Sequence, residues 1–327
     1  MGRTLKGICE ITILFFKSMN QKPTIGYAVQ FALLLGLMGV AFMISSLLMG
    51  LVAAEVMNKP LLQAAAELIK PEHANLARFL NTATTFIAFF IPALVVARVA
   101  SKQPLAYLGF NSRFSSRQIG LVGLITLGSL FLSGGLASLN EMIPMSESFL
   151  KKARELEDQY RSAMIGMATM RSFADYALSL LVIALAPAIF EEVLFRGSMQ
   201  TILSGWTKNA WAGILITSVI FSAIHGSYFG FLPRLALGII LGMIFLQSGN
   251  LWLSIAMHFL NNAIVVTQMY FLTRMGKPIQ QAMDESMPVW YSVIAIAILY
   301  YAFGLFKKES KQINPPTQPA AEYGTMD

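Results

Sequence analysis

The stretch LSLLVIALAPAIFEEVLFR, residues 178–196, places two adjacent glutamates and an arginine in an otherwise apolar run. The run from Leu178 to Phe190 is too short to cross a bilayer alone, but Val193, Leu194 and Phe195 continue it. An ionisable group inside a membrane costs about 2.5–3.5 kcal/mol on insertion scales, so it persists mainly where it faces a cavity or a partner. This stretch therefore predicts a membrane span that carries a polar site.

The composition agrees with a membrane protein. The chain has 327 residues, of which 56% are hydrophobic and 13% charged, and its mean hydropathy is +0.61. Soluble domains have about 25% charged residues, so a large soluble helical protein is disfavoured. Cys9 is the single cysteine, which excludes an intrachain disulfide. The net charge of +7 comes from basic residues in the loops between apolar runs. Such residues set the orientation of a membrane protein, so we interpret the charge in this way and not as a sign of a nucleic-acid partner.

Apolar runs of about 20 residues predict the architecture, because that length of helix crosses a bilayer. We expect an all-α fold, a polytopic membrane bundle of about eight transmembrane helices. No internal repeat is evident, which disfavours a secondary transporter built from inverted repeats. The expected spans are roughly 28–54, 80–98, 118–138, 176–195, 209–227, 231–247, 251–272 and 287–306.

Loop charges predict the orientation. Basic residues dominate the N-terminal end, the loop 98–117 and the C-terminal end, and eight spans place all three on one side. Because cytoplasmic loops are enriched in Lys and Arg, we expect a multi-pass protein of the cell inner membrane with both termini cytoplasmic. Segment 139–172 falls on the opposite side and mixes both signs of charge, which predicts an amphipathic helix on the outer surface.

The predicted domain organisation has three parts. Residues 1–27 form a cytoplasmic N-terminal segment, with 7–18 as an interfacial helix. Residues 28–306 form the transmembrane bundle. Residues 307–327 contain several prolines and are expected to be a disordered cytoplasmic tail.

The charged stretch itself divides into two roles. Glu192 and Arg196 lie four residues apart, so on a helix they share a face and can form an ion pair. Glu191 is turned about 100° away and stays available. Pro187 removes one helix hydrogen bond beside the site. A charged helix end at the membrane surface is the alternative interpretation.

Two further motifs hold two of the three histidines. Phe221 and His225 lie four residues apart in the fifth expected span, and His258 and Asn262 have the same spacing in the seventh. A histidine and an asparagine on one face can donate hydrogen bonds to a developing oxyanion. A backbone-bonded histidine at a helix end and an interhelical hydrogen-bond clamp are the alternatives. The three motifs together predict a hydrolytic site, and a depth count places it nearer the cytoplasmic face.

The three motifs resemble the CPBP family (CAAX protease and bacteriocin-processing, also called Abi) of intramembrane proteases. That family's pattern is Glu-Glu-x-x-x-Arg, Phe-x-x-x-His and His-x-x-x-Asn, and this chain matches every position within about residues 175–270. The resemblance implies a catalytic core there with a cytoplasm-facing cavity, and peptide-bond hydrolysis of the CAAX type. In eukaryotic members this reaction removes a C-terminal tripeptide after a prenylated cysteine.

The resemblance also assigns roles. Glu191 would activate water with help from His225, His258 and Asn262 would stabilise the oxyanion, and Glu192 with Arg196 would orient the site. Family descriptions often name a metalloprotease, and Glu191, His225 and His258 could hold zinc with one position left for water. The chain lacks a His-Glu-x-x-His motif, which favours water activation by glutamate and histidine. Zinc remains the alternative and is the cofactor that the sequence suggests.

The expected partners are a peptide or lipidated protein substrate and membrane lipids, with no nucleic acid. Phe195, Phe221 and Phe259 could line a pocket for an apolar tail, although ordinary packing also explains them. One rival function is a non-catalytic immunity or scaffold protein of the same family. A less favoured rival is a secondary transporter that uses the carboxylates as proton carriers.

Overall fold

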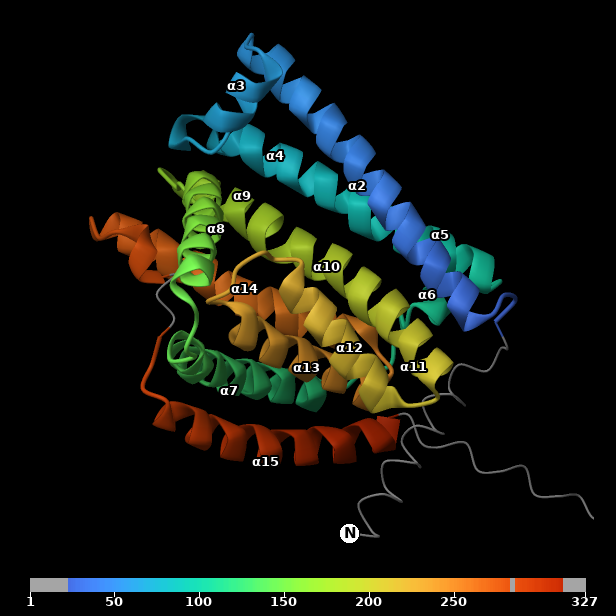
Figure 1. Ribbon diagram of the computed structural model, residues 1–327. Helices are drawn as coiled ribbons and strands as arrows, with labels where there is room; N and C mark the ends of the chain where they lie inside the picture. The colour runs from blue at the N-terminus through green and yellow to red at the C-terminus, as the bar shows by residue number, and fades with distance from the viewer. Residues whose placement is uncertain (1–22, 283–285, 314–327) are drawn as a thin grey trace, which may run out of the picture.

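The computed structural model describes residues 23–282 and 286–313, and every regular element in them is helical (Figure 1). The prediction of an all-α membrane bundle is confirmed. Seven helices of the described residues are long and apolar enough to cross a membrane. They are Tyr27–Met57, Pro71–Ala100, Ser116–Glu141, Phe173–Thr207, Phe231–Ser248, Leu251–Arg274 and Trp290–Ile313.

The expected fifth span is shorter than predicted. It is helix α12, Ala210–Ala223, whose 14 residues rise about 21 Å, and it joins α13 (Phe231–Ser248). Asn209 caps its start by accepting hydrogen bonds from Trp211 N and Ala212 N. Soon after its end, Gly226 has a positive φ of 65°, which suits a residue without a Cβ. The chain therefore turns at Gly226, whereas the sequence predicted a helix up to residue 227.

The elements form three groups in space (Figure 1). Helices α2–α5 form a hairpin along one side, α9–α14 occupy the middle, and α7 packs against α15 on the other side. The first group comprises α2 (Tyr27–Met57), α3 (Leu61–Glu67), η1 (Pro71–His73), α4 (Ala74–Thr85), η2 (Phe86–Phe90) and α5 (Ile91–Ala100), and α6 (Pro104–Tyr107) follows it. The middle group comprises α9 (Phe173–Ser179), η3 (Leu180–Leu185), α10 (Ala186–Glu192), η4 (Val193–Gln200), α11 (Thr201–Thr207), α12, α13 and α14 (Leu251–Arg274). The remaining elements are α7 (Ser116–Glu141), α8 (Glu147–Met167), η5 (Ile279–Ala282) and α15 (Trp290–Ile313).

Two membrane helices contain π-helical turns next to a proline. The π turn η2 ends two residues before Pro92, and the π turn η3 ends two residues before Pro187. A proline inside a helix lacks the N–H that the α-helical pattern requires, and a π turn changes the hydrogen-bond register at that point. The expected disturbance beside Pro187 is therefore present, as a π turn that ends one helical turn or more before the glutamate pair.

The amphipathic helix predicted for segment 139–172 is present as α8. It covers the loop 224–230 between α12 and α13. The Phe149 ring meets the Tyr228 ring edge-on with 5.4 Å between centroids, and Ser227 Oγ donates a hydrogen bond to Glu157 at 2.6 Å. The other end of α8 is fixed by the buried Arg78, which donates to Met167 O at 2.8 Å. Helix α8 therefore bridges α4 and the α12–α13 loop.

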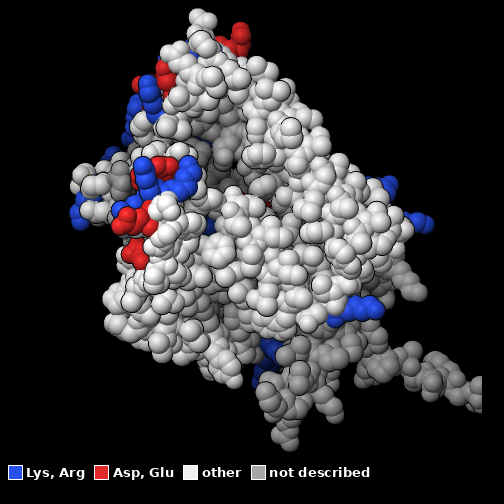
Figure 2. All heavy atoms as spheres, in the orientation of Figure 1, with Lys and Arg blue, Asp and Glu red and all other residues white. Residues whose placement is uncertain are grey.

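Charged side chains gather at two opposite ends of the molecule, and the broad surface between them is uncharged (Figure 2). Acidic and basic residues are mixed at the end that carries α8, whereas basic residues mark the end near α5 and α6 (Figure 2). Large apolar side chains such as Met43, which is 73% exposed, cover the surface of α2. This distribution is that of a helix bundle in a bilayer. The predicted interfacial helix 7–18 and residues 314–327 of the predicted tail lie outside the described residues. The first residues of that tail, 307–313, were expected to be disordered but continue helix α15, so this part of the prediction is wrong.

Candidate active site

The predicted ion pair is present and completely buried. Arg196 Nη1 lies 2.7 Å from Glu192 Oε1, and both side chains have 0% exposure. Arg196 Nη2 also donates to the backbone oxygen of Gly238 on α13 at 3.1 Å. A pair without solvent contact cannot be a solvated helix end, so that interpretation is wrong. Instead, Arg196 joins η4 to α13 through the interior.

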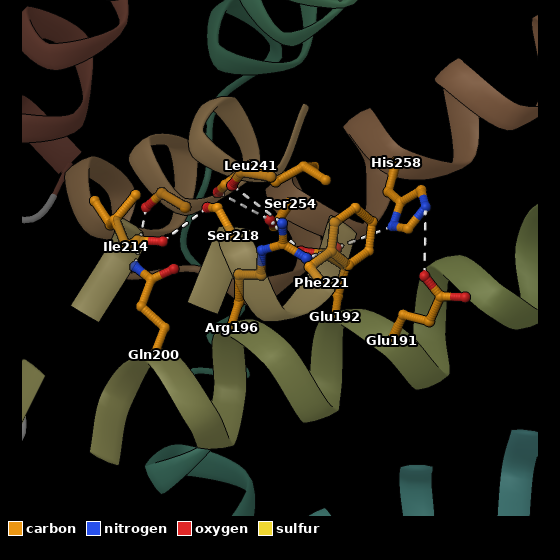
Figure 3. Close-up of polar contacts among 12 residues, drawn as sticks. Glu191, Glu192, Arg196, Gln200, Ile214, Ser218, Phe221, Leu241, Ser254 and His258 are labelled. Carbon is orange, nitrogen blue, oxygen red and sulfur yellow. Dashed lines mark hydrogen bonds and ion pairs between the residues drawn. The ribbon is translucent and has the colours of Figure 1, made fainter. Parts of the chain in front are cut away.

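Glu192 has two more hydrogen-bond donors, both from α14 (Figure 3). His258 Nδ1 donates to Glu192 Oε1 at 2.9 Å, and Ser254 Oγ donates to Oε2 at 2.6 Å. An ionised carboxylate only accepts hydrogen bonds, so Nδ1 of His258 is the donor. With Arg196 and these two groups around it, Glu192 is committed to structure. Ser254 was not predicted, although its spacing of four from His258 places both on one face of α14.

Glu191 is the carboxylate that stays available. Its Oε2 lies 4.0 Å from His258 Nε2, and its side chain is 13% exposed. Figure 3 shows Glu191 and His258 pointing toward one another from α10 and α14. In Figure 2 the visible face is hollowed between α4 and α12, and acidic atoms are seen at the floor of the hollow. The adjacent glutamates therefore have different surroundings, as their positions on the helix predicted.

Phe221 contacts Arg196 and both motif histidines through its ring. The guanidinium of Arg196 lies over its ring at 4.8 Å, and the rings of His225 and His258 meet it edge-on with centroid distances of 4.9 and 6.0 Å. His225 Nδ1 donates to the backbone oxygen of Phe221 at 2.7 Å. The Phe-x-x-x-His motif thus supplies a packing ring and an anchor for the histidine. This bond is the one expected of a structural histidine, and it also leaves Nε2 of His225 free for chemistry.

Asn262 lies on α14 one turn beyond His258. Its side-chain oxygen accepts a hydrogen bond from Asn261 Nδ2 at 3.3 Å, which leaves the NH₂ group of Asn262 to act as a donor. Both asparagines are partly buried. The structure thus brings Arg196, His225 and His258 together around Phe221, whereas the printed contact of Asn262 is with Asn261. Asn261, like Ser254, was not predicted.

The histidines of the predicted zinc set share a feature with metal-bound histidines. Nδ1 of His225 and of His258 each donates to an oxygen, which is the outer hydrogen bond that metal-bound histidines usually make. The donor chemistry of Glu191, His225 and His258 therefore suits zinc. The candidate ligand atoms of these three residues, however, do not all lie within 4.8 Å of one another, as they would around a bound ion. Among the described residues, the triplet whose candidate ligand atoms all lie within 4.8 Å of one another is Glu67, Glu72 and His73, far from this site in the sequence.

Comparison with known proteins supports the resemblance. The family model described as Type II CAAX prenyl endopeptidase Rce1-like matches residues 173–264, which confirms the recognition made from the three motifs. The match covers α9 to α13 and the first part of α14, so it contains every predicted site residue.

Two relatives match over stretches of similar length. An uncharacterized 24.3 kDa protein of Escherichia coli is 36% identical over 92 residues, which is 27% of this chain and 42% of the relative. The uncharacterized protein YpbD of Bacillus subtilis is 33% identical over 88 residues, 26% of this chain and 42% of the relative. The match thus spans less than half of each relative. No solved structure matches the chain significantly.

Proposed function

We propose that this protein is an intramembrane endopeptidase that hydrolyses a peptide bond in a small membrane-associated or lipidated peptide. The observation that carries the proposal is the unequal pair of glutamates. Glu192 is locked by Arg196, Ser254 and His258, whereas Glu191 faces His258 Nε2 at 4.0 Å. A free carboxylate beside two histidines in a poorly solvated place is suited to general base catalysis.

In this mechanism Glu191 accepts a proton from a water molecule as the water oxygen attacks the peptide carbonyl carbon. The separation of 4.0 Å between Glu191 Oε2 and His258 Nε2 is too long for a hydrogen bond, so the Glu191 carboxylate is open to a hydrogen bond from that water. Nε2 of His225 accepts a second hydrogen bond from that water. Glu191 then passes the proton to the leaving nitrogen as the C–N bond breaks, so the products are a carboxylic acid and an amine. The acid afterwards gives its proton to the amine, which leaves a carboxylate and an ammonium.

The oxyanion that forms is stabilised by Asn262 and His258. Asn262 offers its NH₂ group directly. His258 can donate from Nε2 only if its ring holds both protons, because Nδ1 already donates to Glu192. A neutral His258 would instead present a lone pair at Nε2, which is what a metal ligand needs. The protonation state of His258 therefore separates the metal-free mechanism from the zinc alternative.

We also propose that the protein lies in the inner membrane with both termini cytoplasmic. The start of α2 and the end of α15 lie at the same end of the bundle (Figure 1), and α8 lies at the opposite end. The hollow over α10 opens on the uncharged face (Figure 2), which suits a substrate that enters from the bilayer. Labelling a cysteine at position 150 from the cytoplasm alone, or an active C-terminal phosphatase fusion, would contradict this orientation.

The central experiment is cleavage of a fluorogenic lipopeptide by the purified protein in lipid nanodiscs. Wild type should cleave it, and Glu191→Gln should leave almost no activity while keeping the fold. Glu55→Gln is a matched control, because Glu55 is an exposed acid of α2 outside the site. Peptidomics of membranes from cells with wild type and with Glu191→Gln would then identify natural substrates.

The same samples test zinc. When bound, zinc would polarise the carbonyl and acidify water, and Glu191, His225 and His258 would hold it. We expect cleavage to survive prolonged chelation. Stoichiometric zinc that is lost in His225→Ala, with chelator-sensitive cleavage restored by zinc, would overturn the metal-free mechanism and make His225 a ligand.

A non-catalytic immunity or scaffold role predicts a different result. In that case the cellular phenotype would survive Glu191→Gln, and partner binding would be the measurable activity. Proton-coupled flux in liposomes would indicate a transporter.

A further inference from the structure

Arg234, on the first turn of α13, is a cation that lacks an anionic partner among the described residues. Its Nη1 atom is buried without a hydrogen-bond partner. Its guanidinium lies 4.9 Å from the centroid of the Tyr160 ring on α8. A charge away from water normally persists only when paired. The three motifs do not include Arg234. The free-energy cost of keeping its charge without a partner therefore needs a separate explanation.

The position of Arg234 relates it to the candidate active site. Arg234 and Gly238 are four residues apart on α13 and therefore share a helix face, and Gly238 O accepts the hydrogen bond from Arg196. At the start of α13, Phe231 O accepts a hydrogen bond from Ser222 Oγ at 2.6 Å, just before His225 in the chain. The charge of Arg234 is close enough to act on the His225 ring. Arg234 thus lies one turn beyond the buried ion pair, on the side of His225.

The backbone that carries Arg234 is firmly held. Gly230 N donates to Ser227 Oγ at 3.1 Å, and Leu232 N donates to Asn140 Oδ1 at 3.3 Å. At Gly230 an added Cβ would lie 2.1 Å from Arg234 Nη1, so the glycine leaves room for the guanidinium. A cation on such a fixed support is preorganised for a ligand and needs little ordering when it binds one.

The acid that α8 brings to this region is already engaged. Glu157 lies one turn before Tyr160, and it accepts hydrogen bonds from Ser227 at 2.6 Å and from Arg161 at 3.2 Å. Arg234 is stacked on the aromatic ring of α8 instead of being neutralised by its carboxylate. The stacking holds the guanidinium plane but uses none of its N–H donors. Because Nη1 is buried, the donors that remain available to an anion from outside the chain are Nε and Nη2.

We propose that Arg234 binds the C-terminal carboxylate of the peptide substrate, on the leaving side of the cleaved bond. This rests on the proposed endopeptidase function and adds a specificity residue to it. A guanidinium binds a carboxylate through two parallel hydrogen bonds, and the C-terminus is the one main-chain carboxylate that every peptide has. Because each extended residue spans about 3.3 Å, a fixed Arg234 sets how many residues leave with the C-terminal fragment.

The test uses one dansylated, N-acylated peptide made as a free acid and as a C-terminal carboxamide. Full-length protein is placed in nanodiscs of phosphatidylcholine, and binding is measured in the Glu191→Gln variant so that no cleavage interferes. We expect the acid to bind about tenfold or more tightly than the amide, as one charged hydrogen-bonded pair allows. Adding Arg234→Gln should remove this preference by weakening acid binding alone, and Arg234→Lys should retain part of it.

The control is Arg154→Gln, which removes the same charge from an exposed position on α8 and should leave the preference intact. Cleavage by protein with Glu191 present should show the same acid preference in KM. Equal binding of acid and amide would overturn the proposal, as would equal weakening of both by Arg234→Gln, which is the result of a structural clamp to α8. If Arg234→Gln does not fold, the acid–amide comparison in the protein with Arg234 present and the Arg234→Lys variant still show whether Arg234 binds the carboxylate.

Two outcomes separate this proposal from its alternatives. Loss of acid preference when phosphatidylglycerol is added, together with binding of that lipid that depends on Arg234, would assign the site to a lipid headgroup and overturn the peptide assignment. Acid-selective binding without any cleavage by wild type would contradict the endopeptidase and still support Arg234 as a carboxylate site.

Discussion

Two acid–base pairs of this molecule have similar chemistry and opposite surroundings. Lys59 and Glu67 connect the end of α2 to α3, and their side chains are 34% and 15% exposed. Arg196 and Glu192 join η4 to the centre of the bundle, and both are 0% exposed. Water can replace the first pair's interaction, whereas the second depends on the protein alone. The comparison teaches that the cost of separating a pair is set by what else could solvate each charge.

The largest effect is expected when the buried pair is broken. Arg196→Ala leaves Glu192 without its cation in a place that water does not reach, which costs about 3–5 kcal/mol. We expect low expression, a large fall in melting temperature in detergent and no cleavage. Arg196→Lys should recover part of the stability, because it keeps the charge but loses the two-pronged geometry. Normal yield and activity in Arg196→Ala would show that the buried pair is not needed.

The next effect separates catalysis from structure within the same region. Removing one oxyanion donor typically costs about 100- to 1000-fold in rate, so Asn262→Ala should lower kcat by that factor and change KM and melting temperature little. Steady-state cleavage of the fluorogenic lipopeptide measures both constants. A loss that appears only in KM would assign Asn262 to substrate binding instead.

A smaller effect is expected from Ser254→Ala. Ser254 donates to Glu192 at 2.6 Å, and a hydrogen bond to a charged group contributes about 1.5–3 kcal/mol. The variant should melt at a lower temperature than wild type but above Arg196→Ala. Ser248→Ala is less suitable as a control because that side chain also has partners, whereas the exposed Ser148→Ala should leave melting unchanged.

The smallest effect is expected at the exposed pair. The hydrogen bond from Lys59 lowers the pKa of Glu67 from its ordinary value. A lowered pKa in the folded state stabilises above the ordinary pKa, and that contribution is lost as the pH falls through the folded-state value. Because solvent screens this pair, Lys59→Gln should leave expression and melting at neutral pH unchanged. A fall comparable to that of Ser254→Ala would mean that α3 is more important to the fold than its exposure suggests.

The sequence predicted the helices well where they contact lipid and less well where they contact protein. The span that carries the glutamates was expected to end at residue 195, but the helix continues to Thr207. Residues Arg196, Gln200 and Ser204 look like a solvated end in a hydropathy count, yet they are buried. Gln200, for example, donates to Gly242 O. Hydropathy reports preference for lipid, so it cannot anticipate polar groups that neighbouring backbones satisfy.

The sequence predicted part of the contacts among the candidate site residues. The four-residue spacing correctly predicted that Glu192 pairs with Arg196. It also predicted that Glu191 points away from this pair, because both orientations follow from helix geometry. The sequence did not indicate that His258 would bond Glu192 as well as face Glu191, because contacts between helices depend on packing. It also could not reveal Gly238 as an acceptor, because every residue has a backbone oxygen. The catalytic roles of these residues remain predictions.

The π turn η3 before the glutamates has a consequence for how this chain tolerates insertions and deletions. A π turn closes its hydrogen bond one residue later than an α turn, so it behaves as an α-helix with one additional residue. Deleting one residue within Leu180–Leu185 could restore an uninterrupted α-helix and would turn α9 by about 100° relative to Glu191. Tyr176, whose hydroxyl is bonded to Thr267 on α14 at 2.9 Å, would then face elsewhere. A lineage that lost this residue would therefore need compensating changes in α9.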